Sequence, residues 1–160
     1  MRQDSRLSRL LHVLLHMEGH ETPITSEVIA TMLGSNSAVV RRTMAGLREA
    51  GYVTSEKGHG GGWRLARPLS DITLLDVYKA LGEPEIFAFG LADPAPMCLV
   101  ERAVNAAMRD ALRQSQETLL QRFGEIALSD IAKDFDTRAA ETGIPMHLAH
   151  TAAAAGHRHK

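Results

Sequence analysis

A glycine-rich segment between two short strand-like runs constrains the fold more than any other feature of this sequence. Residues 52–54 (Tyr-Val-Thr) and 62–66 (Gly-Trp-Arg-Leu-Ala) have the β-branched and aromatic content of strands. The intervening residues 57–61 (Lys-Gly-His-Gly-Gly) favour a turn, because glycine adopts the backbone angles that tight turns require. The pattern predicts an antiparallel hairpin with a small, positively charged tip.

Three helices are expected before this hairpin. Apolar residues recur at spacings of three and four over residues 7–17, which predicts a helix with one buried stripe that Gly19 ends. A short second helix begins at a cap formed by Thr25 or Ser26, and a third helix runs to about Ala50. Helix, helix, short turn, helix and hairpin follow one another in the order of a winged helix-turn-helix.

The second half of the chain predicts a different kind of structure. After a fourth helix that ends near Gly82, residues 83–97 are rich in proline and form a connector. Residues 98–122 lack glycine and proline, which allows a helix of about 37 Å at 1.5 Å per residue. Small residues line one flank of this helix, so we expect it to pack against a second copy of the chain.

The expected architecture is therefore mostly α, with a small β-hairpin wing and a long C-terminal dimerisation helix. Its parts are a winged helix-turn-helix domain over residues 1–82, the connector over 83–97, a dimerisation helix with a short terminal helix over 98–136, and a flexible tail over 137–160.

Composition limits the cellular setting and the kinds of site. One cysteine in 160 residues excludes an internal disulfide and a cysteine-rich zinc site. No apolar run approaches the roughly 20 residues that cross a bilayer, and the N-terminus lacks the pattern of a secretory signal. A cytoplasmic protein without a membrane partner is expected.

The formal charge is +3 over residues 1–68 and −4 over residues 69–160, which favours a polyanionic partner for the first half.

The third helix and the hairpin tip carry the candidate DNA-binding residues. Arg41 and Arg42 lie opposite the apolar stripe, where arginine can contact guanine or phosphate in a major groove. Polar residues before them lie at the helix N-terminus, where free N–H groups favour phosphate. The tip has the shape of a wing that follows a minor groove. The candidates are Ser35, Asn36, Ser37, Ala38, Arg41, Arg42, Lys57, Gly58, His59 and Gly60; an ordinary solvated helix face and a hairpin without a partner are the alternatives.

Three segments of the chain carry a family resemblance: LREAGYVTSEKGHGGGWRLARP (residues 47–68), ITLLDVYKALGEP (72–84) and MCLVERAV (97–104). They resemble the Rrf2 family of bacterial winged-helix transcription regulators, which includes the iron–sulfur cluster regulator and the nitric-oxide-sensitive repressor. The resemblance implies a homodimer that is clasped by the long helices and binds a palindromic operator in double-stranded DNA. Lys57 and His59 stand where the family usually has an arginine and a proline in the wing.

Cys98 and a pair of histidines are candidates for sensing a signal. Cluster-binding members of the family carry three closely spaced cysteines, whereas Cys98 is alone, so a conventional iron–sulfur cluster is not expected and no cofactor is predicted. The position resembles the cysteine of the cluster-free branch, and a helix N-terminus lowers a thiol pKa, so Cys98 is a candidate redox sensor. A packing residue at the partner helix is the alternative. His12 and His16 have the spacing of a metal chelate, although an exposed polar face explains them equally.

These observations together favour a sequence-specific, homodimeric DNA-binding transcriptional repressor. A winged-helix module for protein contacts and a metal-responsive regulator that uses His12 and His16 are the alternatives. An enzyme is not expected, because no cysteine–histidine signature is present and the glycine run lies between strands instead of before a helix.

Overall fold

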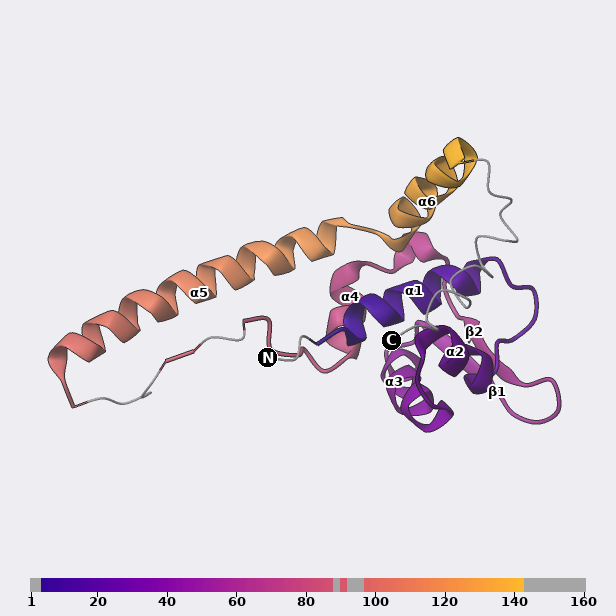
Figure 1. Cartoon of the computed structure of the whole chain (residues 1–160), viewed down its shortest axis with the longest axis horizontal. Helices are drawn as coiled ribbons and strands as arrows, with labels where there is room; N and C mark the ends of the chain where they lie inside the picture. The colour runs from indigo at the N-terminus through magenta and orange to yellow at the C-terminus, as the bar shows by residue number, and fades with distance from the viewer. Residues whose placement is uncertain (1–3, 88–89, 92–96, 143–160) are drawn as a thin grey trace.

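A computed structural model describes residues 4–87, 90–91 and 97–142 of the chain (Figure 1). It confirms the predicted class, which is mostly α with one two-stranded antiparallel hairpin and a long C-terminal helix. The elements of the described residues are α1 (Arg6–Glu18), α2 (Ser26–Leu33), α3 (Ser37–Glu49), β1 (Val53–Glu56), β2 (Gly62–Leu65), the 3-10 helix η1 (Leu69–Asp71), α4 (Leu74–Ala80), α5 (Leu99–Glu125) and α6 (Leu128–Thr142).

Side-chain caps determine where the helices of the helix-turn-helix begin. The Thr25 hydroxyl accepts a hydrogen bond from the backbone N–H of Val28 at 3.3 Å and starts α2. The Asn36 side-chain oxygen accepts one from the N–H of Val39 at 3.0 Å and starts α3. Gly34 ends α2 at φ +57°, a conformation that glycine adopts without strain. The structure thus selects Thr25 over Ser26 as the cap of α2, and Asn36 caps α3.

Helices α1 to α4 and the hairpin enclose one hydrophobic core, and we call this unit the winged head. The apolar stripe of α1 is buried there, which confirms its helical spacing as the signal of a core-facing helix. The start of α6 also contributes to the core, because Leu128 is fully buried. The most deeply buried side chains of the core are Leu10, Val13, Leu14, Ile29, Val40, Met44, Leu47, Val53, Leu69, Ile72, Val77 and Leu128.

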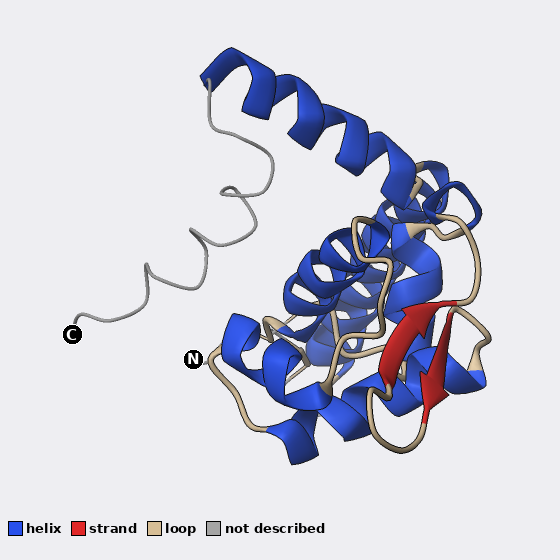
Figure 2. Ribbon diagram, turned by 90° about the vertical axis from the view of Figure 1, so that its right-hand side faces the viewer, coloured by secondary structure: helices blue, strands red, loops and turns tan. Residues whose placement is uncertain are grey.

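The hairpin of β1 and β2 packs against the head through β2 (Figure 2). Strands β1 and β2 pair in antiparallel register from Val53–Leu65 to Glu56–Gly62. Trp63 also forms a β-bridge with Ile24, through backbone hydrogen bonds of 3.0 and 2.8 Å. The Trp63 indole N–H donates to the buried Ser26 hydroxyl at 2.9 Å, so Trp63 anchors the hairpin to α2 as a packing residue.

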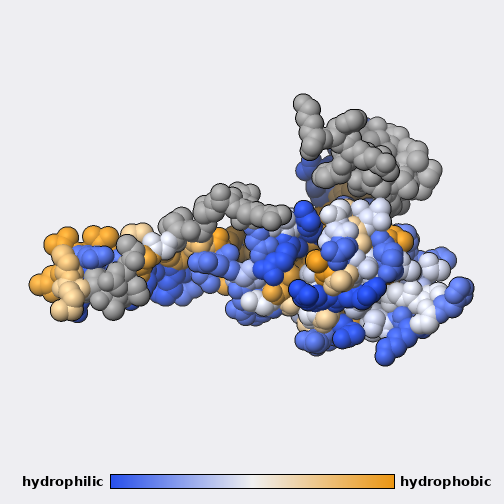
Figure 3. Space-filling model, turned by 60° about the horizontal axis from the view of Figure 1, so that its bottom comes forward, coloured by the Kyte–Doolittle hydropathy of each residue, from blue (hydrophilic) through white to orange (hydrophobic). Residues whose placement is uncertain are grey.

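Helix α5 extends away from the head as a long arm (Figure 1). It has 27 residues and ends at Glu125, slightly beyond the expected end. Asn105 is its only buried residue within the described part of the chain. Exposed apolar side chains gather at the far end of the arm (Figure 3); they are Met97, Leu99, Val100 and Val104. No helix among the described residues is long and apolar enough to cross a membrane.

Helix α6 differs from the expectation of a short helix followed by a tail from residue 137. It continues to Thr142 and has 15 residues, so the expected boundary is wrong for residues 137–142. The helix begins in the core, where the backbone N–H of Leu128 donates to the Ile72 carbonyl at 2.8 Å, and no proline or glycine interrupts the sequence that follows. The remainder of the expected tail, residues 143–160, lies outside the described residues, as do residues 88–89 and 92–96 of the connector.

Candidate nucleic-acid interface

Helix α3 presents its basic face to solvent. Val40, Met44 and Leu47 are buried in the core, as their spacing predicts. Arg41 and Arg42 are exposed on other sides of the helix. Because the core holds one face of α3, the arginine-bearing surface is held in a constant orientation relative to the rest of the head.

An open groove of about 710 Å³ lies between α3, the start of α2 and the hairpin, and we call it the α3–wing groove. The hairpin tip and the start of β2 form one wall, and residues of α3 form the other. Basic and acidic side chains both line it. Its residues are Thr25, Ser26, Glu27, Arg41, Ala45, Arg48, Ser55, Glu56, Lys57, Gly58, His59, Gly60, Gly61, Gly62 and Trp63.

The Arg41 guanidinium is held by an ion pair across the groove. Its Nη2 donates to the Glu27 carboxylate at 3.1 Å and to the Ser37 hydroxyl at 3.3 Å. The pKa of Glu27 is lowered, first by a hydrogen bond from its own backbone N–H and then by Arg41. Glu27 is therefore charged at neutral pH, and a negative group lies directly beside the proposed DNA-contacting arginine.

The hairpin tip is made almost entirely of backbone. Gly58 and Gly60 adopt φ values of +96° and +79°, which side-chain-bearing residues rarely adopt. A Cβ atom on Gly61 would collide with the Glu56 carbonyl oxygen. Lys57 and His59 are exposed on this narrow tip. The result is a slender positive projection that can approach a nucleic-acid groove without obstruction.

The structure brings together only part of the predicted set of DNA-binding residues. Arg41, Lys57, Gly58, His59 and Gly60 all line the α3–wing groove. The residues of the α3 N-terminus and Arg42 lie outside it. Among these, the Asn36 oxygen is occupied by the helix cap, and the Ser37 hydroxyl contacts Arg41. DNA contact by each of these residues remains a prediction.

Sequence reasoning missed the acidic residues of the groove and Arg48. Glu27 is 14 positions from Arg41, so no helical or strand spacing indicates their contact. Arg48 donates to the Ser55 hydroxyl of β1 at 3.5 Å, and Glu56 pairs with Arg64 at 2.9 Å across the hairpin. Each contact depends on how separate elements pack, which periodicity does not reveal.

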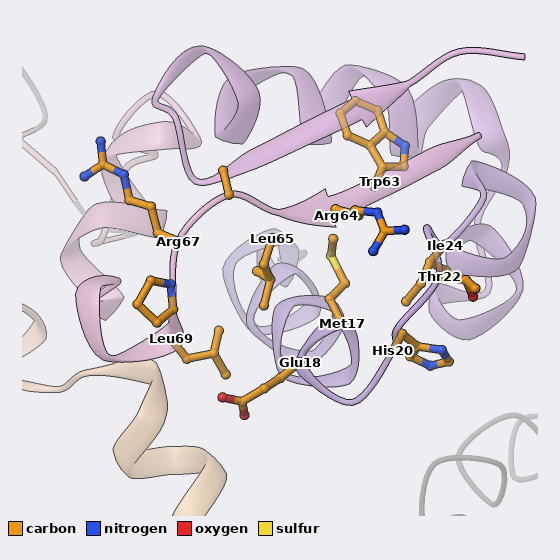
Figure 4. A pocket seen from close by; sticks show the side chains of 12 residues that line it. Met17, Glu18, His20, Thr22, Ile24, Trp63, Arg64, Leu65, Arg67 and Leu69 are labelled. Carbon is orange, nitrogen blue, oxygen red and sulfur yellow. The ribbon is translucent and has the colours of Figure 1, made fainter. Parts of the chain in front are cut away.

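A second cavity, of about 350 Å³, lies between the end of α1 and β2 (Figure 4). Arg64 extends over it and donates to the Glu21 carbonyl oxygen at 2.5 Å as well as to Glu56. The Arg64 guanidinium thus binds groups of the same chain and links the segment before α2 to the hairpin.

The model of the family described as "Rrf2: Iron-dependent Transcriptional regulator" matches residues 3–134 of the chain. The chain belongs to the Rrf2 family. As an Rrf2 protein it is a DNA-binding transcriptional regulator and not an enzyme. The family also supports the assignment of the hairpin as the wing of a winged helix-turn-helix.

Individual relatives agree with the family assignment. The chain is 30% identical over 128 residues to the candidate HTH-type transcriptional regulator YwnA of Bacillus subtilis, which covers 80% of this chain and 95% of YwnA. A crystal structure of a candidate transcriptional regulator from Lactobacillus plantarum superposes with a TM-score of 0.71 at 20% identity, covering 87% of this chain and 95% of that one. IscR of T. potens gives a TM-score of 0.59 at 22% identity, with coverages of 84% and 88%. The two structures show the shared fold.

The donor set of this Rrf2 protein does not fit a cysteine-ligated iron centre. One cysteine cannot supply the several thiolates that such a cluster needs from a subunit. Over residues 4–87, 90–91 and 97–142, no group of three or more His, Cys, Asp and Glu side chains could hold a metal ion. The imidazole Nε2 atoms of His12 and His16 lie 2.7 Å apart, within hydrogen-bonding distance. Metal sensing through this pair stays a prediction, because the described residues add no third ligand beside the two imidazoles.

Cys98 is exposed at the N-cap of α5, at the end of the arm that is farthest from the winged head (Figure 1). The backbone N–H groups of Glu101 and Val100, at the N-terminus of the helix, lower the pKa of its thiol. The helix N-terminus thus favours the reactive thiolate at this position.

Proposed function

We propose that the protein is a homodimeric transcriptional repressor that binds a palindromic operator through α3 and the wing of each subunit. The observation that carries the proposal is the α3–wing groove, which places Arg41 of α3 and Lys57 of the wing along one open surface. A surface with these two components can contact both grooves of a duplex.

The proposed contacts follow from the shapes of the two elements. Ala38 is exposed and Ala45 is half-buried, and both add little bulk to α3, so its backbone can approach base edges in the major groove. Lys57 on the wing provides a flexible positive charge for the adjacent phosphates. Together these contacts would combine base recognition with affinity for the DNA backbone.

Homodimerisation is supported by the composition and exposure of α5. Val100 and Val104 are 72% and 50% exposed along a helix that also carries several exposed alanines. Small residues allow close approach of a second helix, and covering this stripe would remove apolar surface from water. Two copies joined in this way present two heads, which fits a two-fold symmetric operator.

Cys98 supports a redox response as part of the same proposal. Its thiol is exposed, and its pKa is lowered by backbone N–H groups. Oxidation near the start of α5 would alter the packing of the two copies and thereby the separation of their heads. Alkylation of native protein provides a direct test: a Cys98 that fails to react with a small thiol reagent contradicts a sensing role.

One selection experiment tests the proposed function as a whole. Purified full-length protein is used to select fragments of genomic DNA, with and without reductant. We expect enrichment of a palindromic sequence, binding that weakens steeply as salt rises, and a difference between the two redox conditions. Binding to a protein partner that salt does not affect, together with no enrichment of any duplex, would instead favour the protein-interaction alternative.

A further inference from the structure

The carboxylate of Glu27 is unexpected in a surface that contacts a polyanion. It lines the α3–wing groove, belongs to the first turn of α2 and has a side chain that is 67% exposed. A charge in this position repels phosphate and therefore opposes binding to every duplex, whatever its sequence. Its contact with Arg41 is the feature that gives Glu27 a role in this groove.

The Glu27–Arg41 ion pair has little value for the stability of the fold. The Arg41 side chain is 60% exposed, and exposed ion pairs contribute little, because water screens them and two long side chains lose freedom. The contact does restrict the guanidinium. Nη2 is shared between Glu27 on α2 and the Ser37 hydroxyl one turn earlier on α3.

This arrangement leaves most of the donors of Arg41 available to a ligand. Among the described residues, hydrogen bonds from Arg41 involve only Nη2. Nε and Nη1 remain for a ligand, and the Ser37 contact, at 3.3 Å, is the longer of the two. Release of that contact frees one N–H of Nη2 to act beside Nη1 in a two-bond contact with guanine, while Glu27 keeps the other N–H.

We propose that Glu27 is a positioning residue that orients Arg41 toward a base and, through its own charge, weakens sequence-independent binding. An arginine that is already oriented loses less side-chain freedom when it binds a base, and geometry decides whether both hydrogen bonds form. The proposal rests on the proposed contact of α3 with DNA. It goes beyond that contact by naming an acidic residue that increases specificity at the expense of affinity.

The test compares variants on two duplexes of equal length, which are the selected operator and a scrambled sequence. The full-length variants are Glu27→Ala, Glu27→Gln, Arg41→Ala and the double variant with Ala at both positions. The matched control is Glu117→Ala, which removes an equally exposed carboxylate (63%) that pairs with Arg113 at 2.9 Å on α5. Thermal melts of every variant establish that the head remains folded.

The specificity ratio, which is the affinity for the operator divided by that for the scrambled duplex, is the decisive quantity. We expect Arg41→Ala to lower it by about 5- to 150-fold, the range for one two-bond base contact. Glu27→Ala should lower the ratio by a smaller factor of about 3- to 10-fold, while affinity for the scrambled duplex rises. Glu27→Gln retains an acceptor for Arg41, so its specificity ratio should lie between those of the wild type and Glu27→Ala. The specificity ratio of the double variant should equal that of Arg41→Ala, because Glu27 acts on specificity through Arg41.

Two results overturn the inference. In the first, Glu27→Ala has the same specificity ratio as Glu117→Ala and the wild type. In the second, Arg41→Ala leaves the ratio unchanged and only reduces the salt dependence, which would make Arg41 a phosphate contact. A wild-type protein that does not distinguish the two duplexes at all would refute the proposed function itself, so the two failures are separable.

Discussion

The winged head and the α5 arm differ in how far their apolar residues are buried. The head buries its apolar stripes against elements of the same chain, including the start of α6. The arm buries Asn105 and leaves Leu99 75% exposed and Val100 72% exposed. The head therefore has its own core, whereas the apolar residues of the arm stay exposed within one chain. The comparison supports the proposals that the head contacts DNA as a unit and that α5 joins the heads of two copies.

The largest expected effect comes from a charge on the exposed stripe of the arm. Val104→Glu should convert the protein to a monomer, because a carboxylate would be buried between two helices. Affinity for a two-half-site operator should then fall by about 100-fold or more, since the second head no longer binds from the same molecule. Sedimentation and DNA titration measure the two effects.

The control for this variant is Gln116→Glu, which adds the same charge on another flank of α5. Gln116 is exposed, and the variant should remain dimeric and keep its affinity. A monomeric wild type, or a dimeric Val104→Glu, would show that α5 does not join the two copies.

A smaller effect is expected from two glycine-to-alanine changes, one in each region. A Cβ atom on Gly46 of α3 would collide with the Ala80 carbonyl oxygen of α4, so Gly46→Ala should destabilise the protein by about 1–3 kcal/mol despite the helical preference of alanine. Gly124 of α5 meets only the flexible Leu75 side chain at 3.4 Å. Gly124→Ala should be neutral or stabilise by up to about 1 kcal/mol. Urea denaturation measures both, and equal effects would contradict the difference in packing.

The wing should give a change in DNA affinity without a change in fold stability. Lys57→Ala removes one exposed positive charge from the hairpin tip. We expect affinity to fall by about 3- to 10-fold for operator and scrambled DNA alike, and the slope of log affinity against log salt to decrease by about 0.9. A loss confined to the operator would indicate that Lys57 contacts a base.

The smallest effect concerns pH and His12 of α1. Burial lowers the pKa of His12 below its ordinary value of 6.5. The unfolded chain then binds a proton more readily than the folded one, so stability should decrease as pH falls from about 6.5 toward the lowered pKa. Denaturation between pH 7.5 and about 5 should show a weaker pH dependence in His12→Gln.

Local patterns predicted the elements, and packing decided the contacts between them. The spacing of Val40, Met44 and Leu47 correctly predicted the buried face of α3, since helical geometry relates spacing to direction. The glycines of residues 58–62 correctly predicted the hairpin tip. The length of α6 was underestimated, because its start is held by core packing and by backbone bonds to residues far away in the chain.

The sequence by itself determined the helix-turn-helix order, the cationic wing and the long arm, because each follows from the local periodicity or backbone preference of neighbouring residues. Tertiary structure alone decided that Glu27 holds Arg41, that Trp63 donates to Ser26, and that Gly46 must lack a side chain beside Ala80. These contacts join residues on separate elements, and their distances depend on how the whole core packs.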